Sequence, residues 1–398
     1  MAEARLDVQG TDEESLARDV RIRAAGKEVL TPARALGLTR SRAGDLEILS
    51  TTEFASLTTF AEIYSSLTAS RLSDYLDDNG ERLKFETAVE HSLKQAASLG
   101  QIAYLLLRVQ DSKGDPLNAL PPDEELGYVF DLLWRPTNAL VVTPMFGNLR
   151  DIKDYARILH EIRRRQETIG SKPVAITLPS VYRSLTRAAI EQAWKAGVRI
   201  FGLDLEGRSM GAQGTVISLA NMTLGLLSKS DKEAYMLLGL NVKDHIGTGP
   251  YARVHNLLGH AYGFDVVGLN RVRRKGWTAT APKRREVLDS IRFAQTRDYG
   301  YPNVSEMIRI ERKGNSVETD TPALRSVPLN QLKRMNPEYV RTLARLHNAA
   351  KDQREEKMFR EKIETHSLGE YLMNKTRVRE DVELVKRVAA MAKRQREL

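Results

Sequence analysis

Apolar and polar positions follow a regular pattern from about residue 138 onward. Short apolar runs of strand length are each followed by a segment whose apolar residues recur at helical spacing. The predicted strands are 138–144, 173–178, 198–205, 234–241 and 264–269, and the predicted helices are 151–165, 183–196, 216–227 and 251–262. Strand starts therefore lie 25 to 36 residues apart, close to the roughly 30 residues of one βα unit in a (β/α)8 barrel.

This period predicts parallel strands joined by crossover helices, in either a closed barrel or an open doubly wound sheet. Periodicity alone does not separate the two. No GxGxxG or GxxxxGK[ST] segment follows any of these strands, which disfavours an open nucleotide-binding sheet. We therefore expect an α/β fold with a TIM-like (β/α)8 barrel and a charged helical C-terminal extension.

The flanking regions are less regular. We expect a hairpin at 20–31, a strand at 45–50, a helix at 85–98 and a strand at 101–110. The predicted domains are a polar N-terminal arm at 1–19, a barrel at 20–310, a proline-containing connector at 311–337 and a helical extension at 338–398 that Gly369 divides.

Composition narrows the chemistry. The 398 residues include no cysteine and carry a net charge of +9, so disulfides, thiolate nucleophiles and cysteine-ligated zinc are excluded and nucleic acid is the favoured partner. The seven histidines show no metal-ligand spacing, and we expect no metal. The polar N-terminus and the lack of an 18-residue apolar window predict a soluble, cytoplasmic protein with no membrane partner.

Acidic residues stand where predicted strands end. Asp111 follows 101–110, and Asp204 and Glu206 end 198–205. Because strand side chains alternate, Phe201, Leu203 and Leu205 should face the helices and leave both acids toward the barrel interior or its mouth. Alternatively, these two acids form ion pairs with barrel arginines.

Asp265 is the second residue of the predicted strand at 264–269 and shares a face with Val267 and Leu269. If those two residues fill the barrel interior, Asp265 points inward as well. A buried carboxylate is costly without a partner, which makes it a candidate catalytic group. A helix-capping or ion-paired acid is the alternative interpretation.

A dense basic segment follows Asp265. Seven cations occur between 271 and 285 with no acid among them, and Trp277 lies inside the run; the cations are Arg271, Arg273, Arg274, Lys275, Lys283, Arg284 and Arg285. Such a segment suits phosphate binding, and an aromatic ring can stack a base. A solvated charged loop is the alternative.

The segment FDVVGLNRVRRKG (264–276) resembles the F-D-x-V-x-x-x-R-x-x-R-x-G segment of the tRNA-guanine transglycosylases and their DNA-acting relatives. Further pieces occur in the same order as in that family: GKEVLTPA (26–33), DSKG (111–114), FGLDLEG (201–207) and YMLLGL (235–240).

The resemblance implies a pentosyltransferase that replaces guanine by a 7-deazaguanine base in nucleic acid, with DNA slightly favoured over tRNA and no cofactor. Asp265 would attack C1′ and Asp111 would be the general acid and base, so the two must share one barrel mouth. Arg271 and Arg274 would hold flanking phosphates. The base site would include Gly202, Leu203, Asp204, Glu206 and Gly239.

The sequence departs from the family in two respects. The family's zinc ligands, three cysteines and a histidine, are not all present, so the tail after Tyr299 would be held by packing alone. Thr143-Pro144 and Leu178-Pro179 stand where the family has base-reading side chains. Two alternatives therefore stay open. One is a non-catalytic nucleic-acid-binding or partner subunit of the same fold, as a homodimer or paired with an active subunit. The other is an unrelated barrel enzyme that uses Asp204 and Glu206 on a sugar or phosphate substrate.

Overall fold

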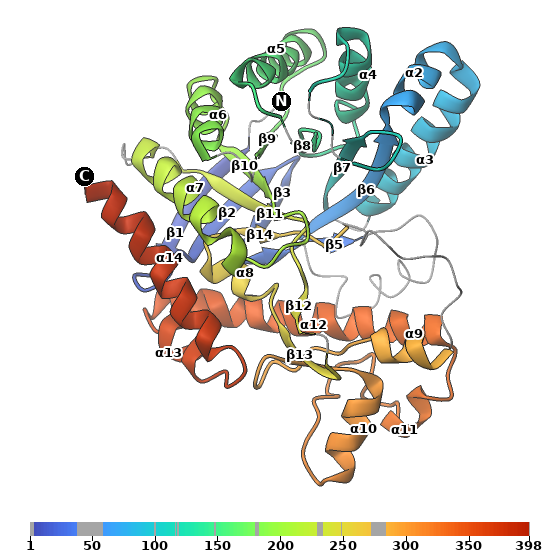
Figure 1. Ribbon diagram of the computed structural model, residues 1–398, viewed down its shortest axis with the longest axis vertical. Helices are drawn as coiled ribbons and strands as arrows, with labels where there is room; N and C mark the ends of the chain where they lie inside the picture. Colours follow the sequence, from blue (N-terminus) through green and yellow to red (C-terminus); the bar gives the residue numbers. More distant parts are fainter. Residues whose placement is uncertain are drawn as a thin grey trace.

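The computed structural model is a mixed α/β fold with many helices around a central parallel sheet of six strands (Figure 1). It describes residues 4–37, 59–98, 101–115, 117, 119–146, 149–179, 183–228, 234–247, 249–271 and 284–397. No helix in these ranges is long and apolar enough to cross a bilayer.

The six-stranded sheet confirms the five strands expected after residue 138. Its order is β4 (Ala33–Arg34), β14 (Val266–Val267), β11 (Met236–Leu240), β10 (Ile200–Asp204), β9 (Val174–Leu178) and β8 (Val141–Val142). Every neighbouring pair is parallel. Strands buried on both faces need apolar residues at successive positions, which explains why these runs are almost continuously apolar.

A second parallel sheet contains β5 (Leu36–Gly37), β6 (Phe60–Thr68) and β7 (Ile102–Gln110). Only Ala35 separates β4 from β5. On the other side of this sheet, the Met145 amide donates to the Leu107 carbonyl at 2.8 Å and the Val109 amide donates to the Met145 carbonyl at 3.1 Å. The strand expected at 101–110 is confirmed, β6 was not expected, and 45–50 lies outside the described residues.

Helices alternate with these strands and lie around them in Figure 1. They are α2 (Ala69–Asp77), α3 (Asn79–Ser98), α4 (Asp123–Leu133), α5 (Ile152–Thr168), α6 (Arg183–Lys195), α7 (Gly214–Leu227, preceded by the 3-10 turn Gly211–Gln213) and α8 (Leu258–Ala261). The helices expected at 85–98, 151–165, 183–196 and 216–227 are confirmed.

The helix expected at 251–262 is wrong. Tyr251–Val254 is strand β13, which pairs antiparallel with β12 (His245–Ile246) and β15 (Gly300–Pro302). Only the four residues of α8 are helical within the expected range. The partner β15 is distant in sequence, and backbone hydrogen bonds to it outweigh the weak local preference for a helix.

Two apolar clusters separate the faces of the strands. The helix cluster joins helices to one strand face and includes Phe201, Leu203, Leu205 and Val267. The strand cluster consists of strand and loop residues and includes Leu240 and Val266. The expected face of Phe201, Leu203 and Leu205 is therefore confirmed.

A three-stranded antiparallel sheet packs on the strand cluster through Val20, Ile22 and Val29. Its strands are β1 (Arg5–Thr11), β2 (Arg18–Ala24) and β3 (Lys27–Leu30). The expected hairpin is confirmed as β2 and β3. Because β1 pairs with β2, residues 5–11 belong to this sheet and do not form a separate arm.

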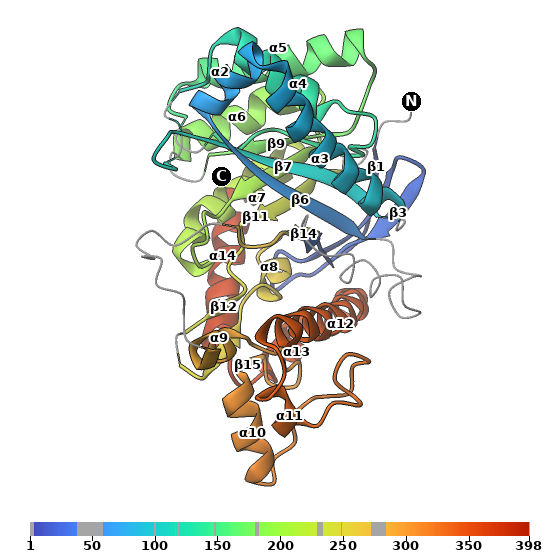
Figure 2. The same cartoon turned by 90° about the vertical axis from the view of Figure 1, so that its right-hand side faces the viewer.

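The C-terminal region is helical. It contains α9 (Arg284–Ser290), α10 (Val304–Arg312), α11 (Leu329–Leu332), α12 (Pro337–Glu364), α13 (Leu368–Met373) and α14 (Arg379–Glu397). Its elements α9 to α13 lie together on one side of the strands, whereas α14 runs beside α7 (Figure 2). Gly369 does not divide the tail, since it lies inside α13; the chain turns just before it, where His366 has a φ of 51°.

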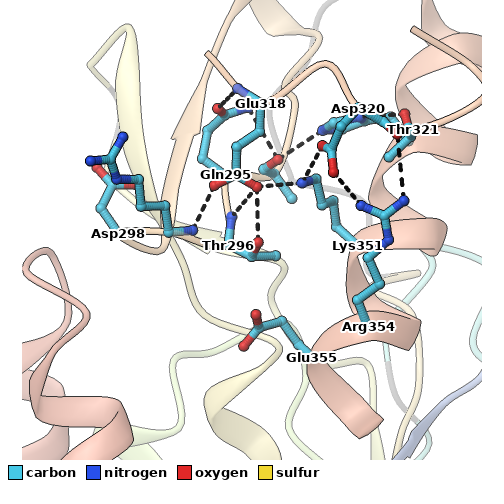
Figure 3. A network of polar contacts seen from close by, with 12 residues as sticks. Gln295, Thr296, Asp298, Glu318, Asp320, Thr321, Lys351, Arg354 and Glu355 are labelled. Carbon is cyan, nitrogen blue, oxygen red and sulfur yellow. Dashed lines mark hydrogen bonds and ion pairs between the residues drawn. The ribbon is translucent and has the colours of Figure 1, made fainter. Parts of the chain in front are cut away.

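Packing alone does not hold this region. Lys351, whose side chain is 3% exposed, pairs with Glu318 and with Asp320 at 2.7 Å, and Arg354 also pairs with Asp320 (Figure 3). The same network engages Thr321, whose hydroxyl lies 2.8 Å from His347 Nδ1. A buried ammonium thus joins the 318–321 segment to α12.

We expect Lys351→Met to lower the free energy of unfolding by about 2–4 kcal/mol, because it leaves the partly buried Glu318 carboxylate without its cation and leaves Asp320 with Arg354 alone. Burial raises the pKa of Asp320, but Lys351 and Arg354 more than offset this and lower it to about 2. A carboxyl group whose pKa is lower in the folded protein stabilises the fold at pH values above its unfolded-state pKa, and this contribution disappears as pH falls toward 2. The difference in unfolding free energy between parent and variant should therefore shrink from pH 6 to pH 2.5 in urea titrations.

Lys357→Met is the matched control, because Lys357 lies on the same helix with its side chain 75% exposed. An equal loss in the two variants would show that the Lys351 network does not stabilise the fold.

Candidate functional site

Asp265 lies at the N-terminal end of β14, directly before Val266. It is 1% exposed, forms an ion pair with Arg18, and its Oδ2 accepts a hydrogen bond from the Leu237 amide at 2.6 Å. Burial raises the pKa of Asp265 to about 6, although Arg18 acts in the opposite direction. The carboxylate is therefore enclosed by protein groups.

Asp265 does not lie on the strand face that packs into the strand cluster. Val266 belongs to the strand cluster, whereas Val267 belongs to the helix cluster. The condition for an inward-pointing Asp265 was that Val267 fills the interior, and this condition is not met. Arg18 also lies over the Tyr235 ring at 3.7 Å, so the pair fixes the start of β2 against the strands.

Asp111 directly follows β7, at its C-terminal end. Its Oδ1 accepts hydrogen bonds from the Lys113 amide at 2.9 Å and the Asp115 amide at 2.7 Å, so the carboxylate closes its own loop. Because the strands are parallel, Asp111 and Asp265 lie at opposite ends of them. The structure does not bring the two acids together.

Asp204 is the last residue of β10 and lies at the same end of the strands as Asp111. Its Oδ1 accepts hydrogen bonds from Asn241 Nδ2 at 2.7 Å and from the Glu206 amide at 2.9 Å. Burial raises the pKa of Asp204, and the bond from Asn241 is the largest influence that lowers it. Asp204 is thus a desolvated carboxylate held by two donors.

Glu206 stands two residues later with a φ of 52°, in the left-handed region that side chains rarely adopt. Its carboxylate pairs with Arg208 at 3.0 Å. Burial, followed by the charge of Asp204, raises the pKa of Glu206. Strained backbone beside two acids with raised pKa values is typical of functional sites.

Several further polar side chains meet at this end of the strands, and we call them the strand-end cluster: Glu62, Tyr64, Arg108, Asp204, Asn241 and Arg271. Glu62 on β6 is fully buried and accepts hydrogen bonds from Arg271 Nε at 3.0 Å and Tyr104 Oη at 3.2 Å. Tyr64 interacts with Arg108 and Asp204. The sequence did not single out Glu62, Tyr64, Arg108 or Asn241, although polar residues at alternate positions of β6 are a usable signal.

Arg271 is the first cation of the basic segment. Its backbone amide donates to Asn241 Oδ1 at 3.2 Å. Gly37 gives its guanidinium room, because a Cβ there would lie 2.4 Å from Arg271 Nη2. Arg273, Arg274, Lys275, Trp277 and Lys283 lie outside the described residues, and Arg284 and Arg285 begin α9 with side chains that are not described.

The remaining residues of the expected base site pack within the sheet. A Cβ at Gly202 would lie 2.9 Å from Leu240 Cδ1, and one at Gly239 would lie 3.1 Å from the Phe264 ring. Leu203 faces the helix cluster. A pocket of about 20 Å³ lies beside Asp204 and Glu206, which is the size of a single water site.

We expect Arg18→Met to cost about 3–5 kcal/mol of unfolding free energy, because it leaves the Asp265 carboxylate buried without its cation. Losing Arg18 also raises the folded-state pKa of Asp265 further above the unfolded value. A raised carboxyl pKa penalises folding once pH exceeds the unfolded value, so the loss should be larger at pH 8 than at pH 5 in urea titrations.

Arg23→Met is the control on the same strand, since Arg23 pairs with Glu28 and its side chain is 54% exposed. If the two substitutions cost the same, or if the loss does not depend on pH, Arg18 and Asp265 are not the buried pair that anchors the N-terminal sheet.

No protein-family model matches the chain, and no curated protein matches it. The family resemblance in the 264–276 segment therefore has no support from these comparisons. The geometry of the strand-end cluster carries the functional proposal instead.

Proposed function

We propose that the parallel strands close into an eight-stranded (β/α)8 barrel. Two observations support closure. Ala35 alone separates β4 from β5, so one segment pairs with β14 on one side and β6 on the other. The hydrogen bonds of Met145 with Leu107 and Val109 join β7 to the segment after β8. In such a barrel, the strand-end cluster occupies the C-terminal end of the strands, where barrel enzymes place their sites.

We infer that this end takes a phosphate-bearing nucleoside within nucleic acid and acts on its glycosidic bond. The observation that carries this proposal is the strand-end cluster itself. In it, Arg108 on β7 attracts the charge of Asp204 on β10, and Asn241 is hydrogen-bonded both to Asp204 and to the amide of Arg271, which follows β14. The carboxylates suit acid and base work at a sugar carbon. The arginines, continued by the basic segment after 271, suit phosphates.

Asp204 and Glu206 are suited to different roles. Asp204 receives two hydrogen bonds that favour its charged form, so it is the group to attack C1′ or to stabilise positive charge there. Burial and then the neighbouring Asp204 charge raise the pKa of Glu206, which suits it to carry a proton. An Asp204 oxygen would form a bond to C1′ as the C1′–N bond breaks and Glu206 donates its proton to the leaving base. The incoming base would then form a new C1′–N bond as the bond between Asp204 and C1′ breaks, and its ring N–H proton would return to Glu206.

The family resemblance implies guanine exchange for a 7-deazaguanine by Asp265 and Asp111 at one barrel mouth, and these two roles are not retained because the two acids lie at opposite ends of the strands. We propose the same class of exchange through Asp204 and Glu206 instead, with DNA slightly favoured over tRNA. We do not assign the attack to Asp265. Its carboxylate is enclosed by Arg18 and the Leu237 amide at the end of the strands opposite Asp111. A nucleophile must come within bonding distance of C1′, and the Asp265 carboxylate is 1% exposed and is surrounded by protein groups.

A second candidate is a nucleic-acid-binding or partner subunit of the same fold without catalysis. One observation favours it: the pocket beside Asp204 and Glu206 has a volume of about 20 Å³, which is too small for a base. In that case the arginines bind nucleic acid and the acids only order the strand ends.

Incorporation of labelled guanine and of a labelled 7-deazaguanine into tRNA and duplex DNA tests the proposal. We expect turnover by the parent protein and a loss of about 100-fold or more in Asp204→Asn, because the neutral amide neither attacks C1′ nor balances charge there. Asp265→Asn is the matched control, since it removes a carboxylate at the other end of the strands.

The outcomes separate the assignments when each rate is referred to folded protein. Loss in Asp265→Asn with retention in Asp204→Asn would return the attack to Asp265. Nucleic-acid binding that weakens with salt, with no incorporation by the parent, would support the non-catalytic subunit.

A further inference from the structure

Asn241 occupies the first position after β11 and is 1% exposed. Its φ is 50°, in the left-handed region that asparagine tolerates better than most side chains. A buried polar residue in this conformation must have its hydrogen bonds satisfied locally to be kept.

Every polar group of the Asn241 side chain has a partner. Nδ2 donates to Asp204 Oδ1 at 2.7 Å and lies 3.2 Å from Met145 Sδ. Oδ1 accepts from the Arg271 amide at 3.2 Å. The Asn241 carbonyl also accepts from the Gly207 amide at 3.0 Å.

These four contacts reach the segments that follow different strands. Asp204 and Gly207 belong to the end of β10 and its loop, Arg271 begins the basic segment after β14, and Met145 follows β8. The amide group is suited to this position because it donates on one side and accepts on the other. A carboxylate cannot donate to Asp204, and an aliphatic side chain can do neither.

We propose that Asn241 is the positioning residue of the strand-end cluster: it orients the Asp204 carboxylate and fixes where the basic segment starts. This inference rests on the proposed function for its role in catalysis, while its effect on Asp204 is a property of the fold. Asn241 does not touch the reacting atoms and acts through Asp204 and Arg271.

Other charges act on Asp204 as well. The backbone amide of Glu206 donates to it, and Arg108 and Arg208 attract its charge. Glu206 and Tyr64 carry the neighbouring titratable groups. A test of Asn241 must therefore leave these groups in place and change only the amide.

Two substitutions meet that requirement. Asn241→Gly keeps the left-handed backbone and removes the amide. Asn241→Asp keeps the shape and sets a second carboxylate against Asp204. We expect carbon NMR titration of the carboxyl groups to give a higher pKa for Asp204 in both variants, and the higher of the two in Asn241→Asp, where a like charge adds to the lost donor.

In the exchange assay, Asn241→Gly should lower kcat by about tenfold or more with KM within about twofold, because one hydrogen bond to a charged group is lost. The acid side of its pH profile should move upward together with the Asp204 pKa.

Asn138→Gly is the matched control. Asn138 is also fully buried, with Nδ2 donating to the Leu133 carbonyl at 2.7 Å and Oδ1 accepting from the Leu105 amide at 3.0 Å, away from Asp204. It should lower thermal stability and leave the Asp204 pKa and the pH profile unchanged.

An Asp204 pKa that is the same in Asn241→Gly as in the parent overturns the positioning role, whatever the activity. If Asn241→Gly raises the Asp204 pKa but the parent protein shows no exchange activity, the positioning role stands and the proposed function is rejected. The two ideas can thus fail separately.

Discussion

The buried ion pair between Arg18 and Asp265 determines how the N-terminal sheet and the parallel strands meet. Two charges of this kind are retained in a protein interior only when each compensates the other's lost hydration. Asp265 is further bound by the Leu237 amide, and Arg18 lies over Tyr235. The start of β2 is therefore fixed against β11 and β14, and this end of the strands is closed by protein.

Further buried polar groups lie toward the opposite end of the strands. There, charges of opposite sign from different strands face one another: Glu62 on β6 pairs with Arg271, and Arg108 on β7 attracts the charge of Asp204 on β10. Desolvation raises the pKa values of the acids, and the neighbouring arginines and amides hold them in place. Such an arrangement is ordered before any ligand arrives, which is what catalysis or specific binding requires.

The C-terminal helices are also held by ion pairs and hydrogen bonds of buried side chains. Lys351 supplies a single buried positive charge to Glu318 and Asp320, while Glu355 accepts hydrogen bonds from Tyr299 and Tyr371 at 2.7 Å. These contacts join segments that are distant in sequence, so they hold α12 to β15 and to α13 without cysteine. The buried cation of Lys351 thus adds to the apolar packing of this region, which includes Phe293, Met307 and Val340.

The sequence by itself determined the parallel strands and most of their helices, because apolar periodicity is a local property that burial on both sheet faces imposes. It also placed Phe201, Leu203 and Leu205 on the helix side and left Asp204 on the other face. It did not reveal β13, whose partner β15 is distant in the chain, or the importance of Glu62 and Asn241, which are isolated polar residues in apolar surroundings. Only the tertiary structure decided that Asp265 faces Arg18 and that Asp111 lies at the opposite end of the parallel strands. Which residues of different strands lie side by side depends on the backbone register between the strands, and no local pattern in the sequence encodes that register.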